Sequence, residues 1–132
     1  MLHIDADEYL ELIKKIPEIP VMQEKWWWTK TPANKTGFVV YVERSGKTKN
    51  ICGSNSPKGG VRPVVTIPNL RIGAGKKILI GSTVFTVIKK DTAFADSIVE
   101  QTAFHNYRYN CNNFSKANIN AHINSPRFLR KL

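Results

Sequence analysis

The spacing of apolar residues predicts a short helix near the start of the chain. Apolar side chains recur every three or four positions at Tyr9, Leu12, Ile13 and Ile16. This spacing places them on one face of a helix. Asp5 can act as the N-cap, and Glu8 three residues later completes a capping box. Because Pro17 ends the run, we expect a helix over residues 5–16.

The middle of the chain alternates apolar and polar residues with a period of two, which is typical of strands. We expect a hairpin with strands at 38–44 and 47–52 and a tight turn at Ser45-Gly46. Residues 61–67 are rich in β-branched side chains and predict one further strand, in which Pro63 favours an edge position. Three more strands are expected at 76–80, 84–89 and 94–101.

The last third predicts helix after loop. Asparagine is frequent between residues 106 and 124, and Ser115 can cap a helix over 115–124. A short final turn is expected after Ser125-Pro126, with Phe128 and Leu129 on it. The chain as a whole is therefore expected to be α+β, with an antiparallel or mixed sheet and two short helices.

Length and composition favour one domain over residues 1–132. The chain is 42% apolar and 23% charged, as in ordinary globular domains. Its longest apolar stretches fall well short of the roughly 18 residues of a membrane span. The first eight residues carry three acids and no Lys or Arg, unlike a secretory signal peptide. We expect no membrane insertion and no signal peptide, and a cytoplasmic location, which would be the host cytoplasm or the virion if a phage encodes the protein.

Charge is the strongest compositional signal. The net charge is +10, but residues 1–24 carry −4, so residues 25–132 carry +14. Such a field favours encounters with nucleic acid, teichoic acid, acidic glycans or an acidic protein, and does not choose among them. A basic surface kept for solubility is the alternative interpretation.

The sequence shows no catalytic or metal-binding motif. Cys52 and Cys111 are not in a CxxC spacing, and the three histidines fit no zinc pattern. Nucleophile-elbow, P-loop and dinucleotide fingerprints are also missing. We therefore expect a protein that is not an enzyme and has no cofactor or metal.

Three segments of the first half follow a recognisable order. They are Trp26-Trp27-Trp28-Thr29-Lys30-Thr31-Pro32, then residues 38–42 with Ser45-Gly46, then Gly60-Val61-Arg62-Pro63-Val64-Val65. They resemble the C-terminal half of a bacterial and phage domain of C-type-lectin fold, which reads WWLRSP, AAYVNSDG and GVRPAL. That domain is similar to the ligand-displaying domains of diversity-generating retroelements and to the formylglycine-generating-enzyme group. We expect the tryptophans to fill the core and Arg62 to hydrogen-bond loop carbonyls.

The second half resembles the N-terminal half of the same family. The matching segments are residues 75–81, 85–88, 113–119 and 122–124. Because this half comes last here, the resemblance implies a circular permutation, with 1–67 corresponding to the family's C-terminal half and 68–132 to its N-terminal half. Strands 61–67 and 78–87 should then share a sheet, against which both helices pack with Trp26–Trp28 between the layers. A fragment across two repeats and a swapped homo-oligomer are the alternatives.

Two activities of this fold are not carried over. Calcium-dependent lectins use Glu-Pro-Asn or Gln-Pro-Asp with Trp-Asn-Asp, none of which occurs here. The reactive cysteine pair of the formylglycine-generating group has a spacing that Cys52 and Cys111 lack. The sequence also has Thr29-Lys30 where the family has Leu-Arg, and His122 where it has Trp.

A recognition or structural module, of phage or phage-like origin, is thus the main hypothesis, with a protein or glycan partner held by loops. The candidate loops are 32–37, 52–60 and 106–113, although Asn and Gly there could simply satisfy turns. The candidate contact residues are Lys30, Asn34, Lys35, Asn55, Lys58, Tyr107, Arg108 and Tyr109. The alternative hypothesis is a basic nucleic-acid-binding or anti-defence protein, in which Tyr107-Arg108-Tyr109 would stack on bases.

Overall fold

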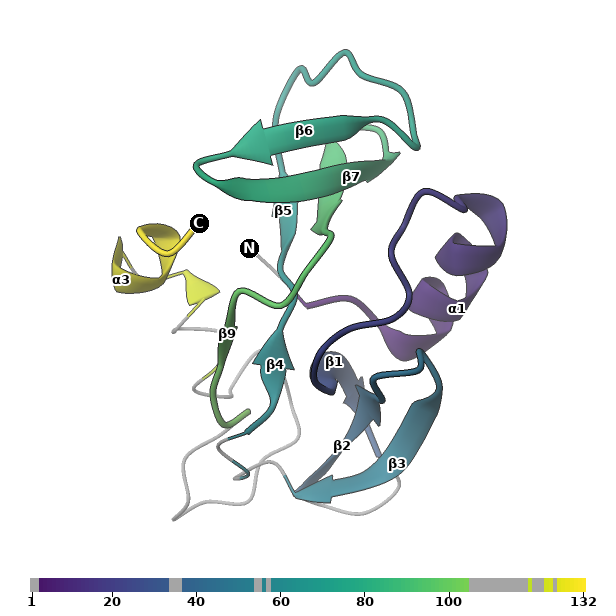
Figure 1. Cartoon of the computed structure of the whole chain (residues 1–132), viewed down its shortest axis with the longest axis vertical. Coiled ribbons are helices and arrows are strands. Elements are labelled where there is room, and N and C mark those ends of the chain that lie inside the picture. Colours follow the sequence, from purple (N-terminus) through teal and green to yellow (C-terminus); the bar gives the residue numbers. More distant parts are fainter. Residues whose placement is uncertain are drawn as a thin grey trace.

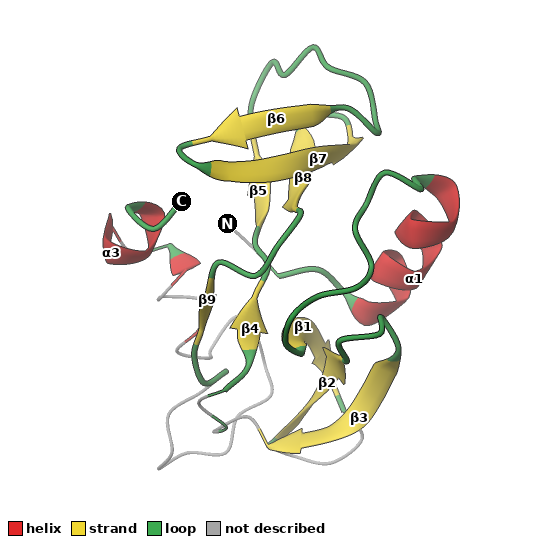
Figure 2. Cartoon of the chain, viewed as in Figure 1, coloured by secondary structure: helices red, strands yellow, loops and turns green. Residues whose placement is uncertain are grey.

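The structure, a computed structural model, describes residues 3–33, 37–53, 56, 58–104, 119, 123–124 and 126–132. It is a small α+β fold with two sheets and the helices α1 (Ala6–Lys15) and α3 (Pro126–Leu129), as Figures 1 and 2 show. The expected α+β class is confirmed. Within the described residues, no helix has the length and apolar character needed to cross a bilayer.

The first sheet has five strands in the order β3-β2-β1-β4-β9. Their bounds are β1 Trp27–Pro32, β2 Phe38–Val42, β3 Thr48–Gly53, β4 Gly60–Val61 and β9 Glu100–Gln101. The β1–β4 pair is parallel and the other pairs are antiparallel, so this sheet is mixed.

The second sheet has four strands in the order β5-β8-β7-β6, all antiparallel. Their bounds are β5 Val64–Thr66, β6 Lys77–Ile80, β7 Thr83–Lys89 and β8 Thr92–Ala95. The hairpin expected from the 76–80 and 84–89 segments is therefore present, with Gly81 in the turn at a positive φ of 62°.

The start of α1 agrees with the sequence pattern. Asp5 is the N-cap, and its Oδ1 accepts a hydrogen bond from the Asp7 amide (2.9 Å). The hydroxyl of Thr31 donates to the other Asp5 oxygen (3.0 Å) and accepts from the amide of Ala6 (2.8 Å). These contacts join the beginning of α1 to the end of β1.

The β2–β3 hairpin also agrees, with Val42 opposite Thr48. Its turn contains Gly46, whose φ of +95° is a conformation that residues with a Cβ rarely adopt. An added Cβ there would lie 2.2 Å from Cγ1 of Val21. The turn therefore lies directly against the segment that leads into β1.

Two expected strands are wrong, because the chain changes sheets inside both. Residues 61–67 divide into β4 and β5, and residues 94–101 divide into β8 and β9. Pro63 has no N–H, but its carbonyl accepts from the Ala95 amide (3.0 Å), and Val61 accepts from Val99 (2.9 Å). The two crossings thus run side by side between the sheets (Figure 1). As a result, β5 shares a sheet with β6 and β7, as expected, while Val61 does not.

Arg62 lies at this crossing and is fully buried. Its Nε donates to the carbonyl of Ala95 (3.1 Å) and its Nη2 to that of Pro20 (3.2 Å), so it makes the kind of carbonyl contacts expected from the sequence. The guanidinium carbon lies 4.7 Å from the ring centroid of Trp27 and 4.3 Å from that of Phe94. Burial lowers the pKa of Arg62 to about 10, which the charges of Tyr9 and Asp96 oppose.

The five-stranded sheet has a hydrophobic cluster on each side. On one side Trp27 packs with Tyr9 of α1 and with Phe94 of the four-stranded sheet. On the other side Trp28 packs with Phe104 and with Phe128 of α3. Trp27 and Trp28 are fully buried, whereas Trp26 is only half-buried, which corrects the expectation that all three fill the core.

The helix packing differs in part from the expectation. The backbone of α1 lies nearest to β1 and β2, in the five-stranded sheet and not in the sheet with β6 and β7. Its side chains still reach Val64, Ile88 and Phe94 of the other sheet through the shared cluster. The helix expected over 115–124 lies mostly outside the described residues. Within that range the structure describes only Ile119, Ile123 and Asn124, and Ile119 and Ile123 are buried.

His3 makes folding sensitive to acid. Its ring is fully buried, Nδ1 donates to the carbonyl of Trp28 (3.1 Å), and burial lowers its pKa from 6.5 to about 4. Between these two pH values the unfolded chain binds the proton more strongly than the folded one. The contribution of neutral His3 to the free energy of unfolding is therefore fully present above pH 6.5. It is lost as the pH falls towards 4 and amounts to about 3 kcal/mol in total.

Urea unfolding of the wild type and of His3→Gln across pH 4–7 measures this contribution. The difference in unfolding free energy between the two proteins should change by about 3 kcal/mol across the range. If the unfolding free energies of the two proteins changed with pH in parallel, His3 would not be the source of the acid sensitivity.

Candidate functional site

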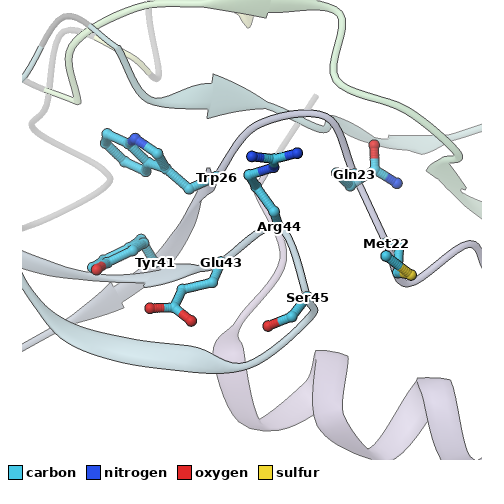
Figure 3. Close-up of a pocket in the computed structure, with 7 residues that line it drawn as sticks. All are labelled: Met22, Gln23, Trp26, Tyr41, Glu43, Arg44 and Ser45. Atoms are coloured by element: carbon cyan, nitrogen blue, oxygen red, sulfur yellow. The ribbon is translucent and has the colours of Figure 1, made fainter.

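An open pocket lined by aromatic rings lies between the segment before β1 and the β2–β3 turn. It has a volume of about 510 Å³ and is lined by Met22, Gln23, Trp26, Tyr41, Glu43, Arg44 and Ser45. We call it the Trp26–Tyr41 groove. Figure 3 shows the two aromatic rings at one end, Met22 and Gln23 at the other, and Arg44 between them.

Trp26 joins the groove to the core. Its ring meets that of Trp28 edge-to-face at a centroid distance of 4.8 Å and that of Tyr41 at 5.1 Å. Trp28 is itself fixed, because its Nε1 donates to the carbonyl of Thr102 (2.7 Å). Trp26 therefore covers the edge of the second cluster and leaves part of its surface to the groove.

Backbone hydrogen bonds hold the walls of the groove together. The Gln23 amide donates to the carbonyl of Arg44 (3.0 Å), and the Gly60 amide donates to that of Trp26 (3.0 Å). The side chain of Gln23 donates to the Asp96 carbonyl (2.9 Å). The first bond joins the two walls, and the other two attach the segment before β1 to Gly60 and Asp96, so the groove is already formed without a ligand.

The described lining of the groove has one residue of each charge, Glu43 and Arg44. The carboxylate of Glu43 faces Nζ of Lys49 on β3 at 3.9 Å. Arg44 is exposed, and within the described residues no carboxylate forms an ion pair with it. The charge in the groove that lacks a partner is therefore positive.

Two other pockets, of about 570 and 520 Å³, share residues 96–99. Asp96 binds both Nζ of Lys77 (2.7 Å) and the hydroxyl of Thr86, and the same Nζ donates to the Glu18 carbonyl (2.7 Å). The polar atoms of this network bind one another and attach the loop at Glu18 to β6 and β7. We read it as a structural network.

The residues proposed from the sequence as contacts do not line the groove. Lys30 lies in β1 and is half-buried. Lys58 is exposed and lies in a turn, and its carbonyl accepts a hydrogen bond from Nε2 of Gln101 (2.7 Å). Outside the described residues lie Asn34, Lys35, Asn55, Tyr107, Arg108 and Tyr109. All eight stay predictions.

Sequence reasoning missed most of the groove. Tyr41 offered one signal, since it alternates with the buried Val40 and Val42, and so had to lie on the other face of β2. Met22, Gln23 and Arg44 offered none, because they meet only through the folding of the turn onto the preceding segment.

Among the residues that the structure describes, no three His, Cys, Asp or Glu side chains are grouped to hold a metal ion. The part of the groove lining that the structure describes has one carboxylate, that of Glu43. Its polar groups are suited to hydrogen-bonding an organic ligand.

Residues 5–69 match a family model described as Domain of unknown function (DUF6273). The match covers slightly less than half of the chain. It includes β1, the β2–β3 hairpin, and the strands β4 and β5 on either side of Arg62. It also spans every residue that lines the Trp26–Tyr41 groove. No curated protein and no solved structure matches.

Proposed function

We propose that this protein is a non-enzymatic recognition module that binds a glycan in the Trp26–Tyr41 groove. The observation that carries the proposal is the pair of half-buried aromatic rings beside a polar rim in a preformed pocket. Ligand pockets commonly combine an apolar floor with a few placed polar groups. A sugar ring has an apolar C–H face and a rim of hydroxyls, so it matches both parts.

The polar rim supplies both kinds of hydrogen-bonding group. Arg44 donates, the carboxylate of Glu43 accepts, and the hydroxyl of Ser45 does both. Tyrosine and tryptophan add contact area at little entropic cost, because each has only two side-chain torsions. A neutral apolar ligand would leave these polar groups unpaired, which disfavours it.

We also propose that the fold is C-type-lectin-like with its halves in permuted order. Support comes from the strand pairing across residue 67: β5 pairs with β8, and β4 pairs with β9. The family match ends at residue 69, close to the same division. In this arrangement Arg62 belongs to the first half, and its hydrogen bond to the Ala95 carbonyl connects it to the second half.

Tyr41→Ala and Trp26→Ala are expected to weaken glycan binding by about tenfold or more, as truncation of central aromatic anchors does in other interfaces. Binding is measured by isothermal titration with the strongest ligand from a panel of oligosaccharides. Leu79→Ala is the matched control, since Leu79 is 67% exposed and lies on β6, away from the groove. Circular dichroism checks that each variant is folded.

Two outcomes would contradict the proposal. One is a panel without any saturable binding. The other is binding to DNA or RNA that is insensitive to Tyr41→Ala and falls with salt, with a logarithmic slope of about −0.7 to −0.9 per phosphate contact. That result would support the nucleic-acid alternative.

A further inference from the structure

We infer that the Trp26–Tyr41 groove is selective for sugars that carry a carboxylate, and that Arg44 is the residue that binds it. This inference rests on the proposed function and adds the ligand class. It is carried by the charges of the groove and by where they lie relative to the rings.

The local charge balance favours an anion. Among the described residues that line the groove, only Glu43 and Arg44 are charged. The carboxylate of Glu43 lies 3.9 Å from Lys49, which offsets its charge from outside the groove. Arg44 has no carboxylate partner in the described part of the chain, so a ligand anion would meet an unmatched cation.

The arrangement of the groove also fits a sugar acid. Arg44 lies beside the pair of rings formed by Trp26 and Tyr41 (Figure 3). In a uronic acid the carboxylate is attached to the sugar ring itself, so ring and anion are neighbours in the ligand too. A guanidinium binds a carboxylate through two parallel hydrogen bonds, which gives geometric selectivity as well as attraction.

The charge of the whole chain acts in the same direction but is not selective. A net charge of +10 draws any anion to the surface. A test must therefore separate a direct contact with Arg44 from the general field. Lys47 provides the control, because it is exposed on the same turn and does not line the groove.

The experiment measures affinities for oligosaccharides of galacturonic, glucuronic and N-acetylneuraminic acid, each beside its uncharged methyl ester. The wild type should bind at least one acid about tenfold more tightly than its ester. Arg44→Gln should remove that preference, whereas Lys47→Gln, which removes the same charge from the same turn, should change affinity less than threefold. Arg44→Lys should retain part of the preference, because it keeps the charge and loses the paired hydrogen bonds.

Three other outcomes would overturn the inference. Equal losses in Arg44→Gln and Lys47→Gln would show that only the general field acts, and would overturn the inference. Binding of neutral sugars that depends on Tyr41 but not on Arg44 would also overturn it, while the proposed function would stand. If no sugar of either kind binds, both fail.

Discussion

Arg62→Ala is expected to lower the free energy of unfolding by about 5 kcal/mol, enough to unfold much of a marginally stable domain. The substitution removes the hydrogen bonds to the carbonyls of Ala95 and Pro20, and the Ala95 carbonyl would stay buried without this partner. It also leaves a cavity between the rings of Trp27 and Phe94. The broken hydrogen bonds and the cavity lie at the point where the chain passes from one sheet to the other.

Urea denaturation followed by tryptophan fluorescence measures this loss. Arg71→Ala is the control, because Arg71 is exposed and should change stability by no more than about 0.5 kcal/mol. Arg62→Lys should also be destabilised, since a single ammonium cannot reproduce both the Nε and the Nη2 hydrogen bonds of the guanidinium. If Arg62→Ala costs less than about 1 kcal/mol, the crossing does not depend on this residue.

Trp27→Ala is expected to cost about 4 kcal/mol, within the range for large aromatic side chains in cores. The ring is fully buried and lies 5.0 Å from that of Tyr9 and 5.8 Å from that of Phe94. It thus connects α1 with both sheets. Since Trp27 also contacts Arg62, the losses of the two substitutions should not add in the double variant.

Trp26→Ala serves as the comparison for this prediction. Trp26 is half-buried and lies at the edge of the second cluster, so its loss should be about half as large. Equal losses at the two positions would contradict the distinction between a core tryptophan and a groove tryptophan.

The elements that could be predicted from the sequence are those set by local signals. Asp5 and the spacing of the apolar residues define α1, and the Ser45-Gly46 turn defines the β2–β3 hairpin. The final turn with the buried Phe128 follows from Pro126 in the same way. In each case the decisive residues are neighbours along the chain.

The change of sheets and the groove could not be predicted in this way. The segment 61–67 is rich in β-branched residues whether it forms one strand or two. Only its partners separate the two cases, because Val61 pairs with β9 and Val64 pairs with β8. The groove depends on Gly46 lying against Val21, a contact between segments far apart in sequence. Alternation alone carries no information on such contacts.

We propose the Trp26–Tyr41 groove as the recognition site, and an NMR titration of the ¹⁵N-labelled protein with the oligosaccharide that binds best tests this directly. We expect the largest shifts at the Trp26 indole N–H and at the amides of Gln23, Arg44 and Ser45, with little change at Lys30 and Lys58. Largest shifts at Lys30 and Lys58, with an unchanged Trp26 indole, would instead place recognition at the contact residues proposed from the sequence and would contradict a binding site in the groove.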